Sequence, residues 1–195
     1  MSSAVDICNL ALAGLGVEDQ IVSLTQDSTN ARMCNLFYEH TRDDELRAHP
    51  WNFAIKRAQL AETTSPDFGK AAAYVLPADF LRLLPADPFS NSTAIDYQIE
   101  GLGDTRVIVT DTESLIEIRY IAKVEDTNLF DPCFREALIG KLRIQLCEKI
   151  TGGSNSKMQI QMERYKQSIR DAKKANAFDN PPQEAPESSW LTCRF

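Results

Sequence analysis

The apolar residues of the chain change their period twice, and this change limits the possible folds more than any other feature. Before Pro50 they recur every three or four residues, as on one face of a helix. From Trp51 to about Val124 they fall in short alternating runs, and after Asp126 the helical period returns. Pro50 is a natural boundary, because a residue before proline avoids the α conformation. The predicted order is two helices, several strands and two helices, an α+β chain.

The N-terminal part predicts two helices. The first is expected over residues 3–15, with Ser2 or Ser3 as its cap, and the second over about residues 28–48. Apolar residues on the face of the first helix are Val5, Cys8, Leu12 and Leu15. The face of the second is made by Cys34, Phe37, Tyr38 and Thr41.

The middle of the chain predicts an antiparallel sandwich or small barrel. Trp51, Phe53 and Ile55 alternate and are expected on one side of a first strand. The further strand segments read AYVLP, FLRLLP, DYQIEG, RVIVTD and LIEIRYIAKV. GLGDTR, at residues 101–106, is expected to be a hairpin turn. Short strands with turn signals at these intervals are typical of a sandwich or barrel.

Two further helices are expected near the C-terminus. The first covers residues 132–150, with Asp131 as its cap and Pro132 at its first position, where the missing N–H has no cost. Its apolar row is Phe134, Leu138, Leu142, Leu146 and Ile150. The last covers about residues 155–177 and carries six basic against two acidic residues, a net charge of +4. Its apolar seam is expected to be Met158, Met162, Tyr165, Ile169 and Ala172.

This pattern predicts three parts. Residues 1–50 and 125–178 are expected to form one bundle of about four helices, with an antiparallel β-rich domain over residues 51–124 inserted between them. Residues 179–195 contain proline and no apolar period, which predicts an extended arm. The large apolar residues at its end indicate anchors for a partner. These anchors are Trp190, Leu191 and Phe195.

Composition narrows the possible functions. The chain has 195 residues and a net charge of −7, whereas proteins that grip DNA phosphates are usually basic. Its five cysteines are widely spaced and include no CxxC pair, so we expect packing residues and no metal site. Reduced thiols fit a protein assembled in the cytoplasm. Neither a secretory leader nor a membrane span is predicted.

Catalytic motifs are not evident. His40 and His49 form no metal-ligating pair, and GLGDTR lacks the third glycine and following helix of a dinucleotide site. The acidic run Asp43 to Glu45 is expected to be a solvated face beside Arg42 and Arg47. We therefore expect no enzyme, no cofactor and no metal.

Five segments, in order along nearly the whole chain, resemble the tail tubular protein A family, the head-to-tail adaptors of short-tailed bacteriophages and prophages. They are AVDICNLALAGLG, LRAHPWNFAIKRAQLA, YVLPADFLRLL, the stretch from FREALIGKLRIQLCEKITGG through MERYKQSIRDAKKANAFDN, and SWLTCR. The resemblance implies a structural virion protein. It also implies a helical bundle with an inserted β-rich domain, as the periods do independently.

The resemblance further implies a dodecameric ring between the portal protein and a tail nozzle similar to tail tubular protein B, at the head–tail interface of the virion. Tail fibres are further possible partners, and the subunit can be a monomer before a portal templates the ring. Double-stranded DNA would pass through the ring without specific binding. Carried over to this chain, Trp190, Leu191 and Arg194 in the arm would contact the portal, and we place Phe195 with them.

Three alternatives stay open from the sequence. One is a neck or head-completion protein of another tailed phage. Another is a small enzyme with a cleft between bundle and β-insert, and the third is a DNA-binding module that uses the last helix. His49, Pro50, Trp51 and Phe53 are interpreted as the junction between the two predicted domains, with Trp51 packed as a core aromatic.

Overall fold

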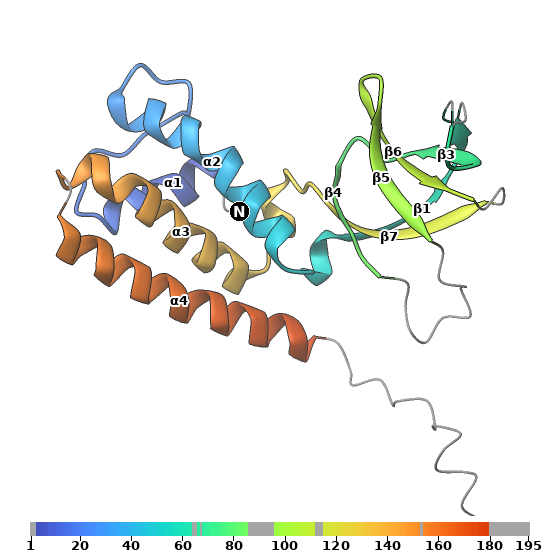
Figure 1. Ribbon diagram of the computed structural model, residues 1–195. Helices are drawn as coiled ribbons and strands as arrows, with labels where there is room; N and C mark the ends of the chain where they lie inside the picture. The colour runs from blue at the N-terminus through green and yellow to red at the C-terminus, as the bar shows by residue number, and fades with distance from the viewer. Residues whose placement is uncertain are drawn as a thin grey trace, which may run out of the picture.

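The computed structural model describes residues 3–63, 66, 68–85, 96–111, 115–152 and 154–179. Within these residues the protein is a mixed α+β structure with four α-helices and two antiparallel sheets. The helices gather on one side of the molecule and the sheets on the other (Figure 1). The predicted α+β class is confirmed.

The first two helices are built as the sequence predicts. Helix α1 (Ala4–Ala13) begins at Ser3, whose hydroxyl accepts the Asp6 N–H while the Asp6 carboxylate accepts the Ser3 N–H at 2.8 Å. This reciprocal capping satisfies two donors that a helix start leaves free. Helix α2 (Thr29–Ala48) is capped by Ser28 and ends before Pro50. The fully buried residues of α1 are Ile7, Cys8, Ala11 and Leu12, so Val5 and Leu15 lie at the margin of the face and not at its centre.

The first predicted strand begins later than expected. Trp51 and Phe53 are not strand residues, because Asn52–Ala54 form a 3₁₀ turn, η1, closed by a bond from the Ala54 N–H to the Trp51 carbonyl. Strand β1 (Ile55–Leu60) follows directly. Alternating apolar residues over only three positions fit a 3₁₀ turn as well as a strand, and here the burial of Trp51 among the helices decides the conformation.

Seven strands of the described ranges form the two sheets. The one with three strands has the order β1-β7-β4, with β4 at Phe80–Leu83 and β7 at Ile116–Ala122. The one with four has the order β2-β3-β6-β5. Its strands are β2 (Glu62–Thr63), β3 (Ala72–Val75), β5 (Tyr97–Leu102) and β6 (Thr105–Thr110). The predicted hairpin joins β5 to β6 and places Gly103 at φ +58°, a left-handed conformation that favours glycine. The short strand β2 had no sequence signal.

The last two helices also match prediction in position. Helix α3 (Pro132–Ile150) starts at Asp131, whose carboxylate accepts the N–H groups of Cys133 and Phe134, and it follows a 3₁₀ turn, η2 (Thr127–Leu129). Helix α4 (Asn155–Phe178) packs along α3 (Figure 1). Its predicted seam is wrong at Met162, which is 40% exposed, since Gln161 takes the buried position instead.

The buried apolar side chains of the described residues form two main hydrophobic cores. The first joins α1, α2, η1, α3 and α4, together with Ile121 and Val124 near the end of β7. The second lies between the sheets and draws side chains from both of them. Members of this second core are Leu60, Ala72, Tyr74, Leu76, Phe80, Ile108, Ile116, Ile118, Tyr120 and Ala122. The chain passes from the first core to the second at η1 and returns after β7.

Candidate functional site

The predicted junction residues lie where α2 passes into η1. Trp51 is 1% exposed, and its indole N–H donates to the Glu45 carbonyl at 2.9 Å. That carbonyl belongs to the last turn of α2, where carbonyls have no helical partner. The indole therefore completes the end of the helix while its ring fills the helical core. Its expected role as a core aromatic is confirmed, although it is not part of a strand.

Aromatic rings surround Trp51. The Phe134 ring meets it edge-on with centroids 4.9 Å apart, and the Phe53 ring stacks at 6.3 Å. Phe53 also lies 5.0 Å from Phe134 and 5.8 Å from Phe130. Such offset and edge-to-face pairs are favourable beyond the area they bury. The cluster joins η1, the segment after η2, and α3.

Asn176, near the C-terminal end of α4, ties that helix to the same junction. Its side-chain oxygen accepts the Asn52 N–H at 2.8 Å, and its backbone carbonyl accepts the Asn52 side-chain amide at 2.8 Å. Its own amide donates to the Pro50 carbonyl at 3.1 Å. We call these three hydrogen bonds the Asn176 clasp. They join residues about 125 positions apart, and no local sequence pattern could have predicted them.

His49 packs against this clasp. Its ring meets Trp51 edge-on at 4.7 Å, and its Nε2 lies 3.4 Å from the Asn176 amide nitrogen. Burial lowers the pKa of His49, and the positive charges of Lys173 and Arg82 lower it further. Both effects favour the neutral imidazole, which suits a ring packed between aromatic and amide groups.

The charged run of α2 is more buried than expected. Arg42 is 4% and Glu45 2% exposed, so the predicted solvated face is wrong at these two residues. The Tyr165 hydroxyl donates to Glu45 at 2.6 Å, and the Lys141 ammonium lies 3.2 Å from the same oxygen. Burial, followed by the bond to Glu45, raises the pKa of Tyr165. The partners come from α3 and α4, and they supply the pairing that a buried carboxylate needs.

A groove of about 630 Å³ runs between α2, β4 and the β5–β6 hairpin. It brings together groups of both charges. The lining residues are His40, Asp43, Asp44, Arg47, Phe80, Leu81, Arg82, Leu83, Ile99 and Arg106. His40, Asp43 and Asp44 come from α2, whereas Arg82 comes from β4 and Arg106 from β6.

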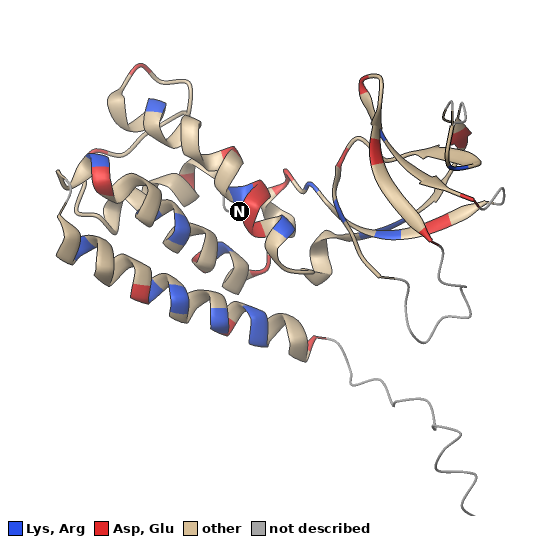
Figure 2. Cartoon of the chain, viewed as in Figure 1, with Lys and Arg blue, Asp and Glu red and all other residues tan. Residues whose placement is uncertain are grey.

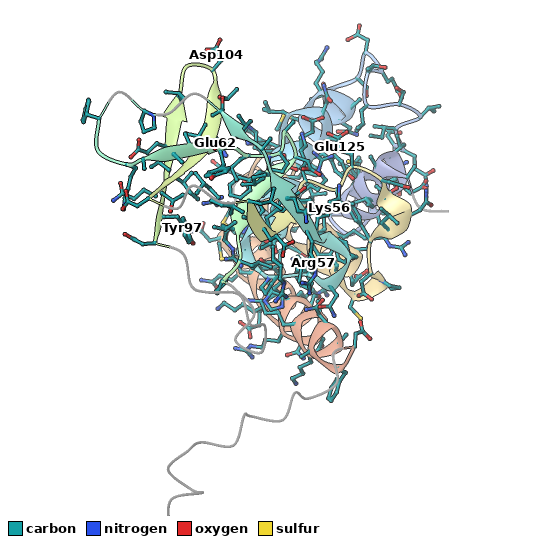
Figure 3. The ribbon with its side chains drawn as sticks, turned by 90° about the vertical axis from the view of Figure 1, so that its right-hand side faces the viewer. Lys56, Arg57, Glu62, Tyr97, Asp104 and Glu125 are labelled. Atoms are coloured by element: carbon teal, nitrogen blue, oxygen red, sulfur yellow. The ribbon has the colours of Figure 1, made fainter. Side chains whose placement is uncertain are left out.

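An exposed strand borders the second sheet. Strand β5 lies at the edge of its sheet, and all six of its residues are exposed. Figure 3 shows Tyr97 at one end of the β5–β6 hairpin and Asp104 at its tip, with Lys56 and Arg57 on β1. An edge strand with free backbone groups is a ready template for pairing with another chain.

The remaining predictions concern the C-terminal arm, the cysteines, metal sites and membrane spans. Trp190, Leu191, Arg194 and Phe195 lie outside the described residues. Cys8, Cys34 and Cys147 are buried free thiols and Cys133 is partly buried, which matches their prediction as packing residues. Across the described ranges, no cluster of three metal-ligating side chains occurs, and no helix has the length and apolar character to span a membrane.

No protein-family model matches the chain, and no curated protein matches its sequence.

Proposed function

We propose that this chain is a structural head-to-tail adaptor of a short-tailed phage or prophage, one subunit of a ring between the portal and the tail nozzle. In this proposal residues 1–50 and 125–178 are a helical bundle domain, residues 51–124 an inserted β-rich domain, and residues 179–195 an arm that docks on the portal. The protein resides in the virion, and DNA passes through the ring lumen without specific binding.

The single observation that carries the proposal is that the buried apolar residues form two separate cores. Residues from both ends of the sequence share one hydrophobic core, while the intervening strands share another. This division supports the helical bundle with an inserted β-rich domain that the resemblance implies. A chain with two cores presents two separate surfaces, as a connector between two different partners needs.

The arm would start at a suitable place. Helix α4 ends at Phe178, whose side chain is 87% exposed, at the end of the bundle that holds the Asn176 clasp. The clasp fixes this end of α4 to the junction, so the arm leaves from a rigid point. Ordering of an extended segment on docking adds contact area at an entropic cost.

The test is binding to the portal protein of the same phage. We expect the full chain to form rings on purified portal by negative-stain imaging, and a chain ending at residue 178 to keep its melting temperature but lose portal binding. Trp190→Ala with Leu191→Ala should reproduce the loss. Ser188→Ala with Ser189→Ala is the matched control and should bind as wild type does. Unchanged binding by the truncated chain would refute the role of the arm.

The two alternatives from other functional classes, an enzyme and a DNA-binding module, would each use a different part of the molecule. A small enzyme would use the groove, and turnover of any substrate that is lost on Arg106→Ala would favour it. A DNA-binding module would use α4, and it would show affinity for duplex DNA that falls steeply with salt. Neither result is expected for an adaptor, whose chain is acidic overall.

A further inference from the structure

Charge is unevenly divided between the two outer sides of the helical part. Helix α4 carries a net charge of +4, whereas residues 3–48, which include α1 and α2, carry eight acidic and three basic residues, a net charge of −5. Figure 2 shows the basic residues along α4. Helix α3 lies between α4 and α2 in Figure 1, and α4 stays on the side away from α2 in the turned view of Figure 3. Of the acidic residues in this part, Glu18, Asp19 and Glu39 are exposed and have no ion pair within the described residues, whereas Asp44 and Glu45 pair with Lys141 of α3.

The outer face of α4 has the composition of a contact surface. All six of its basic residues are exposed, and within the described residues only Lys166 has an ion pair, to Glu163 on the same helix. Met162, Lys166, Arg170 and Lys173 follow one another along a stripe at helical spacing. We call this stripe the basic face. Met162 at its start adds an exposed apolar group.

The opposite side carries matching features. On α2, Leu36 is 61% exposed and lies one turn before the exposed Glu39. The connection between α1 and α2 exposes Glu18, Asp19 and the apolar Val22. We call these five residues the acidic surface. Apolar groups beside charges of one sign are typical of a protein interface, since the charges orient the partner and the apolar groups supply contact area.

We propose that the basic face of one subunit binds the acidic surface of a second copy of this chain. A subunit cannot close such a contact on itself, because the two surfaces lie on opposite sides of its helical part. The contact is heterologous, so each added subunit leaves one free face of each kind, and a suitable rotation closes the assembly into a ring. The inference gives the proposed ring its subunit interface and in that sense rests on the proposed function.

Nucleic acid is the other ligand that a basic helix fits, and it explains less. Duplex DNA would match the cations of α4 but would leave the exposed Met162 and the opposite acidic surface without a role. The chain as a whole carries −7, which repels a polyanion at low salt. A second copy accounts for both surfaces at once.

Charge reversal tests the pairing. Variant A carries Lys166→Glu, Arg170→Glu and Lys173→Glu, and variant B carries Glu18→Lys, Asp19→Lys and Glu39→Lys. Variant A makes the basic face acidic, so both of its surfaces are then acidic. Variant B makes the acidic surface basic, so both of its surfaces are then basic. In variant A the net charge becomes about −13 and in variant B about −1, from −7 in wild type, because each reversal changes it by two. Both variants stay negative, so an equal mixture gains no general attraction.

The readout is sedimentation velocity of the full chain at about 50 mM salt, up to millimolar protein, repeated at about 500 mM salt. We expect wild type to associate at low salt and less at high salt, and each variant alone to associate at least ten-fold more weakly. An equal mixture of A and B should recover association, because each basic surface then meets an acidic one. Arg57→Glu with Arg106→Glu, on the sheets, is the control and should behave as wild type does.

Three results would overturn the pairing. In the first, the wild-type chain stays monomeric at low salt. In the second, the mixture of variants A and B associates no more strongly than either variant alone. In the third, the wild-type chain shows salt-dependent DNA binding, and variant A loses this binding while its self-association is unchanged. Portal binding separates this inference from the proposed function. If the mixture associates but no form binds portal, the adaptor role fails and the surface pairing stands. If portal binds wild type but the mixture stays dissociated, only the pairing fails.

Discussion

Removal of the Trp51 side chain tests the junction most directly. The ring is 1% exposed among Phe53, Phe134 and His49, and its N–H satisfies the Glu45 carbonyl. Truncation of a buried aromatic residue to alanine costs about 3–5 kcal/mol. With a urea m value of about 3 kcal/mol per M, the unfolding midpoint of Trp51→Ala should fall by roughly 1–2 M.

Trp51→Phe separates the ring from its hydrogen bond. Phenylalanine keeps most of the packing but leaves the buried Glu45 carbonyl without its donor, which costs about 1–3 kcal/mol. The expected order of stability is wild type, Trp51→Phe, Trp51→Ala. Far-UV circular dichroism is the suitable probe, since the substitution removes one of the two tryptophans of the chain.

A matched control comes from the connection between β2 and β3. Phe68 is 89% exposed, so Phe68→Ala should change the free energy of unfolding by no more than about 0.5 kcal/mol. If Trp51→Ala unfolds at the same urea concentration as this control, Trp51 does not hold the junction, and the aromatic cluster contributes little to stability.

Two further predictions concern the clasp. Asn176→Ala removes the two side-chain hydrogen bonds to the Asn52 N–H and the Pro50 carbonyl, while the bond to the backbone carbonyl of residue 176 can remain. It should lower the free energy of unfolding by about 1–3 kcal/mol, whereas Asn35→Ala on the exposed side of α2 should be near neutral, and equal urea midpoints would contradict this. Burial lowers the pKa of His49 below about 6.5, so the unfolded chain takes up the proton first and stability should fall as pH drops from about 7. His49→Gln should reduce that fall in melting temperature, and an unchanged profile would refute a buried neutral imidazole.

The parts of the fold that the sequence predicted are those encoded locally. Each helix shows an apolar period along its length, and caps such as Ser28 and Asp131 fix where it starts. Strands β3 to β7 were predicted because short β-rich runs are separated by glycine, proline or polar residues. Strand β2, of two residues, is too short to carry any period.

The wrong predictions of burial all concern residues whose contacts lie far away in the sequence. Arg42 and Glu45 are charged residues on a helix, and their usual place is the surface. Glu45 is buried because Lys141 and Tyr165 lie against it, about 100 residues away. Gln161 replaces Met162 at the buried position of α4 for the same reason, since the neighbouring helix decides which side of α4 is covered. A local pattern has no access to such partners.

Polar contacts therefore act together with the packing on α3 to set the orientation of α4, and this bears on the proposed assembly. Only Gln161 and Ala172 are fully buried on that helix, a small area for its 24 residues. Tyr165 bonds Glu45 of α2 near the middle of α4, and Asn176 bonds the junction near its end. Two fixed points along one helix determine its rotation about its own axis, and so the direction in which Lys166, Arg170 and Lys173 project. Loss of either contact should weaken subunit association even though no residue of the basic face is changed.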